Sequence, residues 1–151
     1  MENKKSFLIL IKNSKGLSLI EILISLTLLA IAGTFITGKV LDSLHEGKVS
    51  SAKIQMNNLA ERLKDFKRHC GNYPTTEQGL DALVEKPAGG TECPRYAPGG
   101  YIEGGKVPQD PWDHDFYYES DGKDFNIISY GSDGQEGGEK EDADISFKDK
   151  K

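Results

Sequence analysis

The chain has 151 residues, of which 36% are hydrophobic and 28% are charged, and its formal net charge is −5. This length allows one domain, or a small domain with an appendage. The acidic balance argues against a nucleic-acid partner, which needs a basic face on the protein. Two cysteines are too few for a disulfide-dense scaffold or a four-thiolate zinc site. The mean hydropathy of −0.52 excludes a membrane protein with several spans.

An apolar segment over residues 17–38 dominates the N-terminal part of the chain. Its 22 residues carry one charge, Glu21, and about 20 apolar residues cross a bilayer as a helix. Residues 1–16 have four lysines and one glutamate, a net of +3. Positive charge ahead of an apolar span keeps that end cytoplasmic. We therefore expect a single-pass membrane protein whose C-terminal part lies across the membrane from the cytoplasm.

Three interpretations of this segment compete. A plain membrane anchor explains the length but not Glu21, because a carboxylate deep in a membrane helix costs roughly 2.5–3.5 kcal/mol. A secretory signal peptide cleaved after Ala32 has a small-residue site in Ala30-Ile31-Ala32, but its apolar core would be long and would contain an acid. The third interpretation gives Glu21 a role.

The local sequence Lys15-Gly16-Leu17-Ser18-Leu19-Ile20-Glu21 resembles the signature of type IV prepilins and pseudopilins. The resemblance implies that a prepilin peptidase cuts between Gly16 and Leu17, that Leu17 is N-methylated and that the apolar segment is retained. The family usually has phenylalanine at the position of Leu17. The Glu21 carboxylate then pairs with the freed amine of Leu17 on a neighbouring subunit, which lowers the cost of burying both charges and sets the register between subunits.

The apolar pattern continues as a helical stripe beyond residue 38. Apolar residues recur at spacings of 3 and 4, which predicts a helix with one buried face; they are Val49, Ala52, Met56, Leu59, Leu63 and Phe66. The absence of proline from residues 17–70 predicts one helix of about 50 residues. The stripe fits packing on the chain's own domain, or a coiled coil, for which it covers few heptads. Gly71 to Pro74 end the helix.

Residues 71–151 read as a small globular part. Thr75 or Thr76 is a candidate cap for a short helix to about Glu85, and proline and glycine mark residues 87–111 as an irregular connection. Extended runs follow at 116–119 and 125–129, separated by the hairpin signal Asp121-Gly122. The predicted fold class is α+β: a long N-terminal spine helix whose hydrophobic half protrudes and whose amphipathic half packs on a small antiparallel sheet.

Three blocks sharpen the resemblance: GNYPTTEQGLDALVEKP, GGYIEGGKVPQDPW and IISYGSDGQEGGEKEDADI. They resemble the major pseudopilins of type II secretion systems, in the order found in that family. The resemblance implies a pilin-like fold with a leader over 1–16, a transmembrane and assembly helix over 17–38, its amphipathic continuation over 39–70 and a periplasmic globular part over 71–151. It also implies a calcium-binding loop near the C-terminus, here residues 130–145.

This loop is rich in acids and glycines. Residues 133–144 contain six acids, one lysine and three glycines, and Ca²⁺ takes six to eight oxygen ligands. The spacing is not that of an EF-hand, so the residues alone leave a metal site and a solvated acidic loop both open. The resemblance implies Ca²⁺ ligation by Asp133, Asp142 and Asp144, with the main-chain oxygen of Tyr130. The role of the ion would be structural, because bound metal contributes folding free energy.

The two cysteines face an oxidising compartment if the predicted topology holds. We expect a Cys70–Cys93 disulfide, which the major pseudopilin pattern does not require. A zinc site that also uses His69 and His114 lacks a close-spaced ligand pair. No nucleophile–base arrangement and no phosphate-binding glycine loop is present in the sequence, so we expect no enzyme.

The expected function is that of a structural major pseudopilin. Copies would polymerise through their apolar helices into the helical, periplasmic pseudopilus of a type II secretion system, with a calcium ion stabilising each subunit. The expected partners are further copies, the prepilin peptidase, other pseudopilins and the inner-membrane assembly platform. The alternatives are a type IV or minor pilin for adhesion or DNA uptake, and a membrane-anchored monomeric calcium-binding module.

Overall fold

A computed structural model describes residues 18–90 and 92–149 of the chain, and within the first helix it leaves the side chains of residues 33–39 undescribed. The predicted leader over 1–16 and Leu17 lie outside the described residues. The chain divides into two compact units, one that ends at Asp42 and one that spans Ser43–Lys151.

One helix, α1 (Leu19–Cys70), accounts for 52 residues. This confirms the prediction of a single long helix, and α1 ends directly before Gly71. Its first turn contains the acid Glu21 and its last turn contains Lys67, Arg68 and His69. Charges of these signs at these ends are favourable, because the helix dipole places partial positive charge at the N-terminus and negative charge at the C-terminus.

The second half of α1 builds the hydrophobic core of the second unit. Ala52 and Leu63 are fully buried, and Met56, Leu59 and Phe66 are nearly so. The predicted stripe therefore faces the chain's own sheet and loops. The core also contains residues from η1 (Leu80–Leu83), from all three strands and from the position just before the first strand, namely Leu80, Ala82, Leu83, Phe116, Tyr118, Phe125, Ile127 and Ile145.

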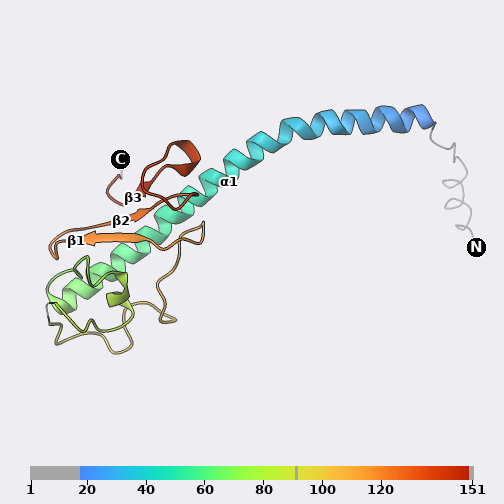
Figure 1. Cartoon of the computed structure of the whole chain (residues 1–151). Coiled ribbons are helices and arrows are strands. Elements are labelled where there is room, and N and C mark those ends of the chain that lie inside the picture. The colour runs from blue at the N-terminus through green and yellow to red at the C-terminus, as the bar shows by residue number, and fades with distance from the viewer. Residues whose placement is uncertain (1–17, 91, 150–151) are drawn as a thin grey trace, which may run out of the picture. The chain divides into compact units, whose positions relative to one another are not determined.

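A three-stranded antiparallel sheet lies along the second half of α1 (Figure 1). Its strands are β1 (Tyr117–Ser120), β2 (Phe125–Ser129) and β3 (Ile145–Ser146), in the order β1-β2-β3. Asp121 forms the predicted hairpin turn by accepting hydrogen bonds from the backbone of Lys123 and Asp124 at 2.9 and 2.8 Å. The short β3, which was not predicted from the sequence, pairs with the end of β2 through Ser129 and Ile145.

The short helix predicted from Thr75 or Thr76 to Glu85 is replaced by a turn followed by the 3₁₀ helix η1. Thr75 pairs with Asp121 in an isolated β-bridge, so its backbone is committed to the edge of the sheet. The side chain of Gln78 also closes the turn, because its Oε1 accepts a hydrogen bond from the Thr75 N–H at 2.9 Å. Tertiary pairing thus overrides the local capping preference, and Leu80 and Leu83 of η1 are buried.

No helix among residues 18–90 and 92–149 is both long and apolar enough to cross a membrane. The span predicted over 17–38 includes Leu17 and the side chains of residues 33–38, which lie outside the description.

Candidate functional site

Glu21 lies in the first turn of α1, where its carboxylate closes the helix N-terminus. The backbone N–H of Ser18 donates to Glu21 Oε2 at 2.9 Å. The first N–H groups of a helix have no partner within the helix, so this contact satisfies one of them. The predicted cleavage pair, Gly16 and Leu17, lies outside the described residues. The described contact of Glu21 is therefore local to its own chain.

The first half of α1 presents an exposed, largely apolar surface over residues 19–32. Leu19 is 83% exposed and Leu29 is 71% exposed. The hydroxyl groups in this stretch turn back onto the helix, because Ser25 Oγ and Thr27 Oγ1 each donate to the carbonyl oxygen four residues earlier at 2.7 Å. Both hydroxyl donors are thereby satisfied internally, which suits this surface to apolar surroundings.

The acidic loop connects β2 to β3 and contains the short 3₁₀ helix η2 (Lys140–Asp142). Asp133 is exposed and accepts a hydrogen bond from the Gln135 N–H at 3.1 Å. Asp142 Oδ1 accepts from Ser132 Oγ at 2.6 Å, and Asp144 Oδ2 accepts from the Gly137 N–H at 2.9 Å. These bonds connect the first half of the loop to its last residues.

Two glycines let the two ends of the acidic loop approach each other closely. Gly131 has a φ of 62°, and a Cβ atom there would lie 3.0 Å from the carbonyl oxygen of Ala143. A Cβ atom on Gly138, whose φ is 89°, would collide with the carbonyl oxygen of Asp142. Any larger residue at either position would push the 142–143 backbone away.

The oxygen atoms of this loop suit a hard cation. Asp144 Oδ1 is shielded from solvent and has no hydrogen-bond partner among the described residues, and an unpaired buried carboxylate oxygen is costly unless a cation or donor reaches it. Burial raises the pKa of the Tyr130 hydroxyl, and the nearby negative charge of Glu136 adds to this shift. Carboxylate and main-chain oxygens are the ligands that Ca²⁺ prefers. The chemistry of these oxygen atoms is therefore compatible with the ion that the family resemblance implies.

The predicted ligands are not closed into a carboxylate cage. In the described part of the chain, no three His, Cys, Asp or Glu side chains gather in an arrangement that could hold a metal. The exposed carboxylate of Asp133 makes its described contact with the backbone two residues on. The acids Glu136, Glu139 and Glu141 are also exposed. Main-chain oxygens would therefore have to supply a large share of any coordination shell.

Cys70 and Cys93 form a disulfide, with their Cα atoms 4.6 Å apart. Cys70 is the last residue of α1, and Cys93 is 3% exposed in the loop after η1. The bond closes the segment 71–92 into a ring.

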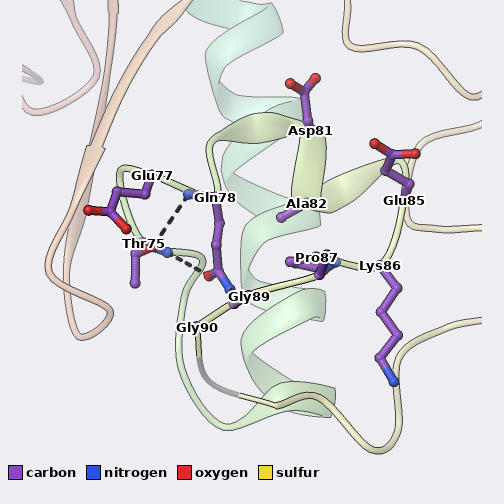
Figure 2. Close-up of a pocket in the computed structure, with 11 residues that line it drawn as sticks. Thr75, Glu77, Gln78, Asp81, Ala82, Glu85, Lys86, Pro87, Gly89 and Gly90 are labelled. Carbon is purple, nitrogen blue, oxygen red and sulfur yellow. Dashed lines mark hydrogen bonds between the residues drawn. The ribbon is translucent and has the colours of Figure 1, made fainter.

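A surface pocket of about 500 Å³ is lined by residues of this segment, between the turn at Thr75 and the loop 86–90 (Figure 2). Gln78 crosses it, donating from Nε2 to the carbonyl oxygen of Gly89. The acids Glu77, Asp81 and Glu85 line the pocket together with Lys86. None of the predicted processing, assembly or metal residues lines it.

Sequence reasoning missed a buried group next to the acidic loop. Asp110 is 4% exposed and accepts hydrogen bonds from the backbone of Trp112 and His114 and from the hydroxyl of Ser129. Aspartate side chains often accept a hydrogen bond from the backbone N–H two residues on, so an aspartate such as Asp110 is a turn signal in a sequence. Asp110, Asp113 and Asp115 lie close together in the sequence, so the pattern alone does not distinguish the buried Asp110 from the other two. Asp113 instead has a φ of 67° in the turn.

A long helix packed by its second half on a three-stranded antiparallel sheet is the pilin-like fold of pseudopilins. The N-terminal part of the chain agrees, because residues 11–37 match the profile described as the prokaryotic N-terminal methylation motif. Residues 39–148 match the profile described as type II secretion system (T2SS), protein G. The chain belongs to this family.

Individual proteins support the assignment. The type II secretion system core protein G of Pseudomonas aeruginosa is 35% identical over 136 residues, covering 89% of this chain and 94% of that protein. The core protein G of Vibrio cholerae is also 35% identical over 136 residues, covering 89% and 91%. The crystal structure of the major pseudopilin from enterohaemorrhagic Escherichia coli matches with a TM-score of 0.60 at 33% identity, covering 70% of this chain and 90% of that one.

These findings confirm the resemblance and the fold class expected from the sequence. The chain is a major pseudopilin of a type II secretion system, and as a member of a family of structural subunits it is not an enzyme. The methylation motif spans Gly16 and Leu17 and implies processing by a prepilin peptidase. Membership of the family implies a place in a periplasmic pseudopilus.

Proposed function

We propose that this pseudopilin is cut between Gly16 and Leu17, stays in the inner membrane through residues 17–38 and polymerises into a helical periplasmic filament. The apolar surface that begins at Leu19 carries the proposal. Its side chains are exposed and its hydroxyl groups are satisfied within the helix, so lipid before assembly and neighbouring copies after it are its natural surroundings.

Glu21 supplies the register of the proposed filament. Within its own chain, the Glu21 carboxylate accepts the Ser18 N–H. Cleavage creates a charged amine at Leu17, four residues before Glu21, and in a bundle of apolar helices an unpaired carboxylate and an unpaired amine are each costly. Pairing the Glu21 of one copy with the Leu17 amine of the next removes both costs at one axial offset between subunits. Other pseudopilins and the assembly platform in the membrane would meet the same surface.

The assembly proposal is tested by Glu21→Ala in the full chain, with Glu61→Ala as the control. Glu61 is an exposed acid on the second half of α1, paired with Lys64 at 2.7 Å. We expect Glu21→Ala to be inserted and processed but to form no filaments by electron microscopy, while Glu61→Ala forms them normally. Normal filaments from Glu21→Ala would contradict the proposed register.

N-terminal sequencing of membrane-extracted protein tests the processing step separately. The expected first residue is methylated Leu17. A chain that begins at Gly33 would indicate ordinary signal-peptide cleavage, and a chain that begins at Met1 would indicate no cleavage; either result overturns the proposal.

We further propose that a calcium ion stabilises the acidic loop. Asp133, Asp142, Asp144 and the main-chain oxygen of Tyr130 would hold it. The observation that supports the proposal is that Asp144 Oδ1 is shielded and has no hydrogen-bond partner in the part of the chain that the structure describes. When bound, the ion supplies positive charge among six acids. The loop residues themselves bring the two ends of the loop together at Gly131 and Ala143, and the ion would stabilise that closure.

Calcium titration of the full chain in detergent tests this proposal, with EGTA as the metal-free reference. At a calcium concentration of about 100 times Kd, binding adds about 2.7 kcal/mol to the free energy of unfolding, so the melting temperature should fall in EGTA. Asp144→Asn should abolish the difference, whereas Glu136→Gln, an exposed acid of the same loop, should keep it. If the wild type had the same melting temperature with calcium and with EGTA, the proposal that calcium stabilises the loop would be wrong.

A further inference from the structure

The buried carboxylate of Asp110 lies outside the acidic loop but is connected to it. Asp110 Oδ1 accepts the backbone N–H groups of Trp112 and His114, each at 2.9 Å, and Oδ2 accepts the Ser129 hydroxyl at 2.5 Å. A buried charge is tolerated when donors satisfy it, and these three donors do so. The carboxylate therefore fixes both the 110–114 turn and the end of β2.

Ser129 passes this constraint to the first residues of the acidic loop. Its side chain is completely buried, and its hydroxyl oxygen accepts the Gly131 N–H at 3.3 Å while donating to Asp110. One hydroxyl thus joins the carboxylate of Asp110 to the backbone one residue beyond Tyr130.

His114 supports the same segment from a second side. Its Nδ1 lies 3.2 Å from the carbonyl oxygen of Gly131. The imidazole ring also lies against Gly134, where a Cβ atom would come within 2.9 Å of His114 Cε1. Because Asp110 holds the backbone N–H of His114, the ring and the Ser129 hydroxyl are both fixed by one buried group.

We infer that Asp110, acting through Ser129 and His114, is the positioning residue of the calcium loop: it holds residues 129–134 beside the 142–143 backbone before the ion binds. This inference rests on the proposed calcium site. Gly131 is the point where the supported segment meets the carbonyl oxygen of Ala143. A loop ordered in advance loses less conformational entropy on binding, so the network raises calcium affinity without contributing a ligand.

A residue that merely stabilised the fold would give a different result. Loss of a general core contact lowers the stability of the calcium-free and calcium-bound protein alike, and leaves the affinity of the folded protein for calcium unchanged. Loss of a positioning contact weakens calcium binding itself. The dissociation constant for calcium, measured on folded protein, therefore separates the two roles.

The experiment compares Ser129→Ala and His114→Phe with Tyr118→Phe in the full chain in detergent. Tyr118→Phe removes a buried hydrogen bond to the Pro74 carbonyl oxygen, on a strand that does not flank the acidic loop, and serves as the matched control. His114→Phe retains a ring beneath Gly134 while removing Nδ1, so it is milder than Ser129→Ala. The probe is Ca²⁺ itself, followed by isothermal titration calorimetry below the melting temperature.

We expect Ser129→Ala to raise Kd for calcium by about tenfold or more, the usual effect of losing an outer-shell partner, and His114→Phe to raise it less. Tyr118→Phe should lower the melting temperature and leave Kd unchanged. Unchanged Kd in both Ser129→Ala and His114→Phe, with normal binding by the wild type, would overturn the positioning role alone. A wild type that binds no calcium would overturn the metal proposal and this inference together.

Discussion

The two halves of α1 use similar apolar residues in opposite ways. In the first half, Leu19 and Leu29 are 83% and 71% exposed, whereas in the second half Leu63 is completely buried. Both halves belong to one continuous helix of 52 residues. The second half contributes buried residues to the hydrophobic core that the sheet and η1 also form.

This comparison shows that one continuous helix can contain a half that contributes to the core and a half whose described side chains are exposed. Propensity and internal hydrogen bonds suffice to continue a helix, but most helical stability in globular proteins comes from packing of one face. The second half obtains that packing from its own chain. The first half, in the proposed function, obtains it from lipid and from other copies.

The largest predicted effect tests this division directly. Leu63→Ala removes a fully buried side chain and should lower the free energy of unfolding by about 2–5 kcal/mol. Leu29→Ala, on the exposed half, should change it by less than about 0.5 kcal/mol in the detergent-solubilised monomer. Urea denaturation of the full chain followed by circular dichroism measures both. Equal losses would break the comparison, because they would place the two halves in one cooperative core.

Removal of the disulfide should have the next largest effect, and only in the second unit. The Cys70–Cys93 bond spans 23 positions of sequence, and closing a loop of this size stabilises by about 3 kcal/mol in the chain-entropy description. The double variant Cys70→Ala, Cys93→Ala should lose about this amount in the same denaturation experiment. A reductant should destabilise the wild type but not the double variant, and an unaffected wild type would contradict the prediction.

The smallest predicted effect is a loss of stability at alkaline pH. Burial raises the pKa of Tyr118 to about 12, and its hydroxyl donates to the carbonyl oxygen of the buried Pro74 at 2.8 Å. The folded-state pKa exceeds the unfolded value of about 10, so the protonated tyrosine favours the fold. This contribution is complete below pH 10 and is lost as the pH rises toward 12.

Tyr118→Phe should therefore flatten the decline of the melting temperature above pH 10. The control is Tyr117→Phe, its half-exposed neighbour on β1, which should retain the decline. The same slope in both variants would show that Tyr118 is not responsible for it.

The features that depend on local pattern were predictable from the sequence. The spacing of Ala52, Met56, Leu59 and Leu63 predicted a buried helix face because a helix repeats its surface every 3.6 residues. Asp121-Gly122 predicted the hairpin because the turn requires those residue types locally. The acidic loop was predicted as a region, from its density of acids and glycines.

Apart from the Cys70–Cys93 disulfide, which joins the two cysteines of the chain, the features that depend on distant partners were not predictable. Thr75 bonds to the edge of the sheet near Asp121, and no local signal announces that pairing, so a helix was expected where a turn forms. The burial of Asp110 was not predicted, because its bond to Ser129 joins residues 19 positions apart. The two-residue strand β3 is too short to show any periodicity of its own.

The disulfide affects how the subunit bears a pulling force applied along α1. Cys70 is the last residue of α1, and its disulfide with Cys93 connects the end of the helix directly to the chain beyond residues 71–92. Tension applied along α1 is therefore shared between the peptide bond to Gly71 and the disulfide. The disulfide therefore protects the segment that contains η1 and its flanking turns from unfolding when α1 is pulled.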